Sequence, residues 1–191
     1  MNELIEKLKS NIALSTEAEE YLISISTVKE YSKGEVVIRQ GDPITKVLFV
    51  LDGCLRSFCT DKTGKDHTLL FAIKDWWISD YIAIHSEEPA SLSVECLNDS
   101  RLIAFDSRKL MESLSLFPEF QPFQRKLLER HMVSLHKRIL NHLQLSASER
   151  YDLFLKQYPD IEQFTSNYHI ASYLGIAKES LSRIRAKKAE N

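Results

Sequence analysis

The sequence predicts an α+β protein in which an N-terminal β-roll (a double-stranded β-helix) flanked by helices is followed by a long helix and a C-terminal helix-turn-helix. Three observations predict it: short apolar runs separated by glycine turns, a later stretch of helical spacing without glycine or proline, and a glycine-centred pair of apolar stripes near the C-terminus. The 191 residues are enough for one or two domains. We expect a roll at 1–122, a dimerisation helix at 123–145 and a helix-turn-helix domain at 146–191.

The chain begins with two segments of helical spacing, at residues 3–9 and 15–25. Each places apolar side chains three or four positions apart, which is the pattern of a helix with one buried face. Ser15 precedes the second segment and is a candidate N-cap. The apolar positions are Leu4, Ile5, Leu8, Ala18, Leu22 and Ile25.

The zone after residue 28 has the composition of short strands. Four of the five glycines lie here at intervals of roughly ten residues, in turns such as Gly41-Asp42-Pro43 and Asp52-Gly53. Short strands at such spacing are typical of a β-sandwich or barrel. The expected strands are 36–38, 47–51, 55–59, 68–73, 91–96 and 101–105.

Helical spacing returns at Lys109–Leu116, and Pro118 and Pro122 interrupt it before a long helix from Phe123 to about Leu145. Apolar residues on that helix are spaced 4-3-4, as in a coiled-coil seam. The alternative is a helix packed on its own domain, since only about two heptads are present. A further helix fits 147–158. The seam consists of Leu128, Met132, Leu135 and Ile139.

Residues 166–185 have the layout of a DNA-binding helix-turn-helix. Gly175 stands where the chain must turn sharply, and glycine tolerates a positive φ there. Small Ala171 permits a close helix crossing. Apolar stripes hold the two helices together through Ile170, Leu174, Leu181 and Ile184.

The outer face of the second helix is rich in polar side chains that can reach base edges in a major groove. Segment 166–191 carries five Lys or Arg residues and two Glu residues, a net charge of +3, whereas the whole chain has −2. This asymmetry favours phosphate binding, although any αα-hairpin needs a similar turn. Candidate base contacts are Lys178, Glu179, Ser180, Ser182 and Arg183, and candidate phosphate contacts are Ser166, Arg185, Lys187 and Lys188.

Composition and residue spacing also argue against several other classes of protein, namely membrane, secreted and metal-binding proteins. No apolar run approaches the roughly 20 residues of a membrane span, and the charged N-terminus does not resemble a secretory signal. The three cysteines have no CxxC spacing, which favours a reducing cytoplasm. His131, His136 and His142 are spaced five and six apart, so they do not form the i, i+4 pair of a helical zinc site. We expect no metal, no cofactor and no catalytic activity.

Three motifs carry a resemblance to a known family. Residues 33–42 read KGEVVIRQGD, residues 49–56 read FVLDGCLR, and residues 147–151 read ASERY. Together with the order of parts, they resemble the roll turns and domain entry of the Crp/Fnr superfamily of bacterial transcription regulators. The resemblance implies a cyclic-nucleotide-binding-type roll, a dimerising helix and a helix-turn-helix. It also implies a palindromic double-stranded DNA operator, a small-molecule effector and RNA polymerase as a candidate partner.

The expected effector pocket departs from that family. Members that bind cyclic nucleotides hold the ribose with Gly-Glu and the phosphate with an arginine about ten residues later. Here Ser79 and Asp80 occupy the first positions, and Ala90 falls near the arginine position. No Lys or Arg lies between Trp76 and Arg101, whereas a buried phosphate needs charge-assisted donors. We expect another ligand or none, at a pocket formed by Trp77, Ser79, Asp80, Ala90 and Ser91.

The C-terminus departs as well, because only six residues follow Arg185, where family members carry a winged hairpin. We therefore expect a truncated or absent wing and weakened DNA affinity. The sequence favours a homodimeric, sequence-specific DNA-binding regulator that does not respond to cyclic AMP. The alternative is a ligand-binding or protein-interaction module whose DNA binding has decayed.

Overall fold

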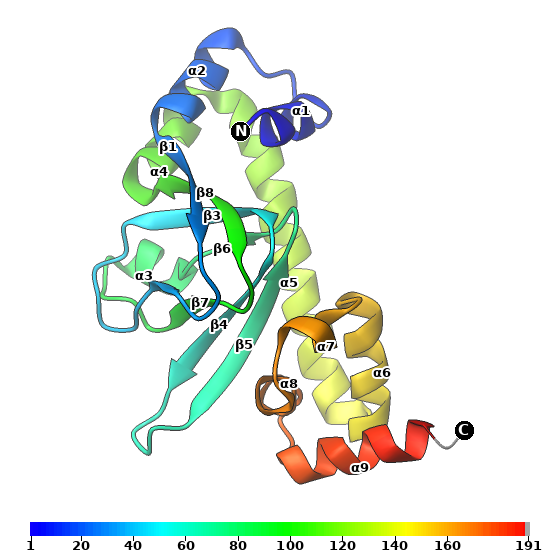
Figure 1. The fold of residues 1–191 in the computed structure, drawn as a ribbon. Helices are drawn as coiled ribbons and strands as arrows, with labels where there is room; N and C mark the ends of the chain where they lie inside the picture. Colours follow the sequence, from blue (N-terminus) through cyan, green and yellow to red (C-terminus); the bar gives the residue numbers. More distant parts are fainter. Residues whose placement is uncertain (190–191) are drawn as a thin grey trace.

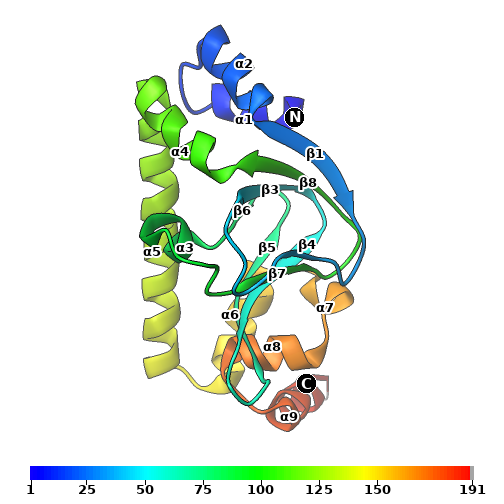
Figure 2. The same ribbon diagram turned by 90° about the vertical axis from the view of Figure 1, so that its left-hand side faces the viewer.

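The computed structural model describes residues 1–189. Two N-terminal helices and a β-roll occupy one end, the longest helix runs along the roll, and four shorter helices cover the other end (Figures 1 and 2). The helices are α1 (Asn2–Lys9), α2 (Thr16–Ser24), α3 (Tyr81–Ser86), α4 (Ser107–Leu116), α5 (Gln121–Gln144), α6 (Ala147–Gln157), α7 (Ile161–Phe164), α8 (Asn167–Leu174) and α9 (Lys178–Ala189), with a 3-10 turn at Pro118–Phe120.

The roll consists of two four-stranded antiparallel sheets. One sheet has the order β1-β8-β3-β6 and the other β2-β7-β4-β5. Apolar side chains from both sheets, such as Leu48, Leu55 and Leu102, meet in one buried cluster. The strands are β1 (Ser26–Tyr31), β2 (Val36–Ile38), β3 (Lys46–Asp52), β4 (Cys54–Thr60), β5 (Asp66–Ile73), β6 (Trp77–Ile78), β7 (Ser93–Cys96) and β8 (Ser100–Asp106).

The hairpin between β3 and β4 depends on Gly53. Its φ is +104°, and a Cβ at this position would lie 2.2 Å from Oγ of Ser100. Both the left-handed backbone and the close approach therefore require glycine.

The helices at the two ends have separate cores. Leu4, Leu8 and Leu22 from α1 and α2 pack with Phe49 and Phe105 of the roll. The C-terminal helices share a second core with the β4–β5 side of the roll. The C-terminal segment is thus packed on the roll as well as linked to it by α5.

Several elements differ from the sequence expectation. The edge strand β1 and the two-residue strand β6 were not expected, because their short runs lack clear alternation. The short helices α3 and α7 were also missed. α5 begins at Gln121, two residues earlier than expected, because Pro122 lies in its first turn, where proline is tolerated. Glu190 and Asn191, which end the segment where a truncated wing was expected, lie outside the described residues.

Candidate nucleic-acid interface

Helices α8 and α9 are joined by a tight turn centred on Gly175. Its φ of +67° lies in the left-handed region. The Gly175 and Ile176 N–H groups donate to the carbonyls of Ser172 (3.1 Å) and Ala171 (3.0 Å), which is the Schellman pattern. This turn fixes where α9 starts relative to α8. The predicted apolar stripe of the pair is buried, comprising Ile170, Ala171, Leu174 and Leu181, while Ile184 is half-buried.

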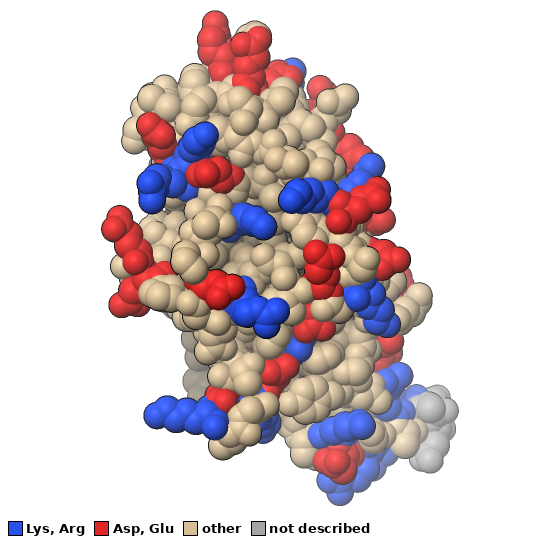
Figure 3. All heavy atoms as spheres, turned by 60° about the vertical axis from the view of Figure 1, so that its left-hand side comes forward, with Lys and Arg blue, Asp and Glu red and all other residues tan. Residues whose placement is uncertain are grey.

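The outer face of α9 is largely open to solvent. Lys178, Glu179, Ser182 and Arg183 are exposed, and Ser180 is half-buried. Arg183 donates to Oγ of Ser180 over 3.4 Å, so both side chains lie on one side of the helix. In Figure 3, basic side chains gather at the lower end, over the C-terminal helices, whereas both signs alternate elsewhere on that face. This face can therefore present donors to an anionic surface.

Three of the residues predicted to contact phosphate are engaged within the protein. Arg185 donates to Oδ1 of Asn167 (2.5 Å) and lies 3.3 Å from a carboxylate oxygen of Glu162. Lys188 is paired with Asp152. Ser166 caps α8, since its hydroxyl accepts from the His169 N–H over 3.4 Å.

Lys187, the fourth residue of that group, is exposed. Among the predicted phosphate contacts, Arg185 and Lys188 form ion pairs with carboxylates, and Ser166 lies at a helix cap. A contact between Arg185 or Lys188 and phosphate would compete with an existing ion pair.

Hydrogen bonds join α8 to strand β5 of the roll. The hydroxyl of Ser172 accepts from the Thr68 N–H (2.9 Å) and donates to the Asp66 carbonyl (3.0 Å). The Arg138 guanidinium, from α5, donates to the carbonyls of Leu69 and Tyr173 and stacks on the Tyr173 ring at 4.2 Å. One arginine thus joins the long helix, the roll and α8.

An aromatic cluster fills the space between the roll and the C-terminal helices. Phe71 of β5 contacts Phe154, Tyr158 and Tyr173, with ring centroids 5.4–5.7 Å apart, and Trp76 lies 5.6 Å from Tyr158. Sequence reasoning missed this interface. The only signal was the unusual density of tyrosine and phenylalanine in residues 151–173, which does not indicate what the rings contact.

Burial has a chemical consequence for His169 of α8. Its Nδ1 is buried without a hydrogen-bond partner among the described residues. Burial and the nearby Arg56 guanidinium lower the pKa of His169 below the usual 6.5. The folded protein therefore favours a neutral imidazole at this position.

The expected effector pocket is occupied by a side chain of the protein itself. Asp80 is only 1% exposed, and its carboxylate accepts from the Ser91 N–H (2.6 Å), the Ser91 hydroxyl (2.8 Å) and the Leu92 N–H (3.2 Å). The same side chain caps α3 by accepting from the Ile82 and Ala83 N–H groups. Donors that could hold an anion at this point are thus satisfied internally.

The other residues predicted for this pocket do not all lie together. Trp77 packs in the edge-on aromatic contact with Phe49 (5.1 Å) and lines a separate apolar cavity of about 80 Å³ beside the N-terminal helices. The hydroxyl of Ser79 donates to the Lys46 carbonyl, and Ala90 is buried. Asp80 and Ser91 are therefore the members of the predicted set in direct contact, and Trp77 faces a different region.

The predicted seam of α5 is open in the single chain. Leu128, Met132, Leu135 and Ile139 are between 39% and 57% exposed. Leu143, which was not part of the prediction, is 78% exposed and continues the apolar face toward the C-terminal end of the helix. Exposed apolar patches of this kind are typical of interaction surfaces.

Residues 1–189 contain no group of three or more His, Cys, Asp or Glu side chains placed to hold a metal ion. Within the same residues, no helix has the length and apolar character needed to cross a membrane.

The chain is similar in sequence to a known domain and to two named proteins. Residues 28–115 match the cyclic nucleotide-binding domain. The transcriptional activator protein Anr of Pseudomonas aeruginosa is 24% identical over 170 residues, which cover 83% of this chain and 69% of Anr, and FnrA of Stutzerimonas stutzeri gives the same figures.

Solved structures agree in fold. FixK2 from Bradyrhizobium japonicum has a TM-score of 0.74 at 18% identity, covering 85% of this chain and 84% of FixK2. A protein of Eubacterium rectale described as a regulator of the Crp/Fnr family also gives 0.74 at 18% identity, covering 93% and 85%. The chain therefore carries a match to the cyclic nucleotide-binding domain and shares its β-roll, long helix and C-terminal helix pair with a solved structure described as a Crp/Fnr-family regulator.

Proposed function

We propose that the protein is a sequence-specific, DNA-binding transcription regulator that acts as a homodimer. The observation that carries the proposal is the asymmetry of the helix pair: α8 is packed on the roll, whereas the polar face of α9 is left exposed behind a fixed Gly175 turn. In a helix-turn-helix, the second helix enters the major groove with its N-terminal residues toward the bases. The relatives Anr and FnrA are named as transcriptional activators, which supports the same function.

The base-reading residues we propose are Lys178, Glu179, Ser180, Ser182 and Arg183. Their side chains lie on the first half of α9, and arginine can bind guanine O6 and N7 through two donors. Lys187 contacts the phosphate backbone in this proposal, and Ser166, Arg185 and Lys188 lie nearby. Because Arg185 and Lys188 already have carboxylate partners, a contact between either of them and phosphate would compete with an existing ion pair.

Dimerisation through α5 would bury the exposed seam. Leu128, Met132, Leu135 and Ile139 form one apolar face that has no cover in the single chain. A two-fold axis along this face would place two copies of α9 for a palindromic operator, with half-sites about 34 Å apart. We place this activity in the cytoplasm, where a transcription regulator meets DNA and RNA polymerase.

The roll, in this proposal, does not bind cyclic AMP or cyclic GMP in the usual family manner. The Asp80 carboxylate takes the Ser91 and Leu92 donors that face it, and it would repel a second anion. Another effector, or none, acts at the roll.

Selection of DNA from a random library by the purified protein tests the proposal. The expected result is a palindromic motif whose two halves lie one helical turn apart. Binding that has no sequence preference, or no binding at low salt, would favour the alternative of a module with decayed DNA recognition.

A further inference from the structure

A large cleft separates α5 from α6 and α8, on the side of α5 away from the seam. Its volume is about 570 Å³, which lies within the range of small-molecule sites. The cleft is lined by five Lys or Arg side chains and a single carboxylate, that of Glu129. The five cations are Lys126, Arg130, Lys137, Arg138 and Arg150.

The positive charge of the cleft is not neutralised within the protein. Among residues 1–189, none of the ion pairs involves these five cations, whereas Glu129 is paired with Arg125 at 3.9 Å. Because the chain as a whole has a net charge of −2, this concentration of charge is local. A low-dielectric wall beside it focuses the field and attracts anions.

Two of the cations are held in place by carbonyl oxygens. Arg150 donates to the carbonyls of Leu145 (2.7 Å) and Leu174 (3.3 Å), and its Nε is buried with no partner among the described residues. Arg138 is held by the Tyr173 carbonyl at 3.1 Å. Both guanidinium groups are therefore held at fixed positions beside the cleft.

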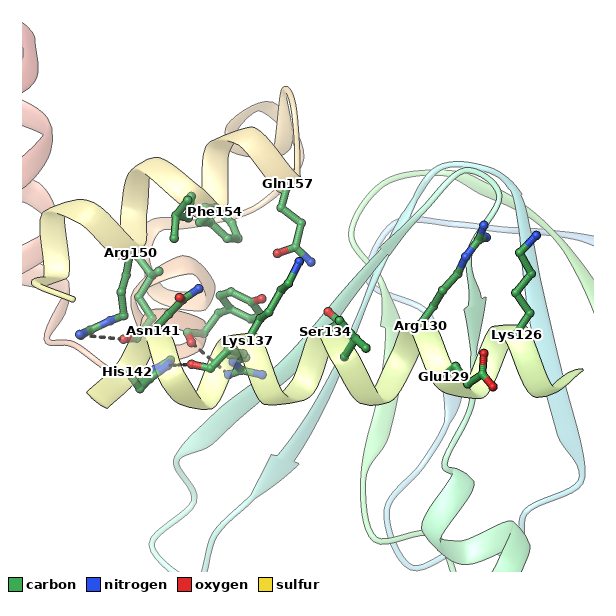
Figure 4. Close-up of a pocket in the computed structure, with 15 residues that line it drawn as sticks. Lys126, Glu129, Arg130, Ser134, Lys137, Asn141, His142, Arg150, Phe154 and Gln157 are labelled. Carbon is green, nitrogen blue, oxygen red and sulfur yellow. Dashed lines mark hydrogen bonds between the residues drawn. The ribbon is translucent and has the colours of Figure 1, made fainter. Parts of the chain in front are cut away.

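The other three cations are exposed and spread along α5. At 1.5 Å per residue, Lys126, Arg130 and Lys137 are separated by about 6 and 10 Å along the helix. Figure 4 shows these side chains projecting from the same side of α5, with Lys137 extending toward Gln157 of α6. Such a row suits a ligand with several negative charges better than a single small anion.

The cleft also has apolar and hydrogen-bonding groups. Val133 and Leu153 lie on its walls, and the amides of Asn141 and Gln157 can donate or accept. At about 100° per residue, Lys126, Arg130 and Lys137 lie roughly opposite the seam positions on α5, so dimerisation through the seam leaves the cleft open.

We propose that this cleft binds a nucleoside polyphosphate or a similar small molecule, in which clustered phosphates are linked to a flat ring that can pack on an apolar wall. The phosphates contact Arg130 and Lys137, and the ring lies against the apolar wall. The ligand would bridge α5 and α6, and so would add contacts between the long helix and the helices that carry α9. This site is separate from the roll pocket and from the DNA-facing surface of α9.

Calorimetric titration of the full chain with ATP and AMP, in the absence of DNA, tests the proposal independently of DNA binding. We expect saturable ATP binding at low salt and at least roughly tenfold weaker binding of AMP, because two phosphates are lost. The double variant Arg130→Gln/Lys137→Gln should weaken ATP binding by about tenfold or more. The matched control Lys29→Gln/Lys33→Gln, which removes two exposed lysines from the roll, should leave it unchanged.

Three results would overturn the proposal. Two of them concern ATP alone: the absence of saturable heat with millimolar ATP, and a loss of ATP affinity in the control variant equal to that in the Arg130→Gln/Lys137→Gln variant. The other is that ATP does not bind while the Arg130→Gln/Lys137→Gln variant lowers the salt slope for random duplex DNA by about two, since the cleft would then be a surface for the DNA backbone.

Discussion

Two regions of the molecule have hydrogen-bond donors that suit an anion. In one region the donors are bonded to a carboxylate of the chain itself, and in the other they are open to solvent. At residues 79–92, the carboxylate of Asp80 accepts from α3 and from the segment before β7, so the region is closed. On α9, Lys178 and Arg183 face solvent. The anion that the roll donors bind is therefore the chain's own Asp80, whereas any anion bound by α9 would have to come from outside the chain.

The largest expected effect comes from charging the seam. Leu135→Glu/Ile139→Glu would bury like charges at the two-fold axis without partners, so we expect complete loss of the dimer at tens of micromolar and of specific DNA binding. Sedimentation velocity measures the first effect. The matched double variant Ser134→Glu/Asn141→Glu, on the other side of α5, should remain dimeric. A monomeric unmodified protein would contradict the proposed dimer.

Removing the Asp80 carboxylate should destabilise the roll. Asp80→Ala leaves several buried N–H groups without an acceptor, and we expect a loss of about 3–5 kcal/mol in the free energy of unfolding. Urea denaturation measures it. Glu88→Ala, an exposed carboxylate in the same segment, should change stability by less than about 0.5 kcal/mol. Equal stability of the two variants would mean that Asp80 does not organise this region.

On the exposed face of α9, Arg183→Ala should weaken the binding free energy for the selected operator by roughly 1–3 kcal/mol. It should also relax the base preference at one position of the operator. Lys187→Ala should instead weaken all sequences alike and lower the salt slope by about one. Fluorescence anisotropy with operator and random duplexes separates the two roles. If both variants affect the two duplexes equally, α9 reads no bases.

The smallest effect concerns pH at the junction between α8 and the roll. Because burial lowers the pKa of His169 in the folded protein below 6.5, the unfolded chain binds more protons at acidic pH. The stability contribution is fully present above pH 6.5 and is lost as the pH falls through the lowered pKa. The urea midpoint should decrease over this range, and His169→Gln should reduce the decrease. An unchanged pH profile in the variant would contradict this assignment.

Much of the fold could be predicted because the relevant signals are local. Glycine spacing identified the hairpins of the roll, and Gly175 identified the turn before α9. The edge strand β1 escaped notice because its residues are mostly exposed, so no buried face imposes alternation. α3 was missed because six residues are too few for a clear helical period, although Asp80 directly before it is a favourable N-cap.

The candidate site was less predictable than the fold. The exposure of Lys178 and Arg183 follows from helical periodicity. The partners of Arg185 and Lys188 come from α7 and α6, and pairings between helices leave no mark in the spacing of residues. The docking of Ser172 and Tyr173 on the roll was invisible for the same reason. The lack of Lys and Arg around Asp80 was read from the sequence, whereas the role of Asp80 as an internal acceptor required the structure.

The central claim is that the protein binds DNA through α9 while its roll is closed to cyclic nucleotides. The most direct measurement is a titration of the selected operator with and without millimolar cyclic AMP. The account predicts saturable, sequence-specific binding whose dissociation constant is the same under both conditions. A change of about tenfold or more on adding the nucleotide, the size of an ordinary allosteric coupling, would contradict it, as would failure to bind the operator at all.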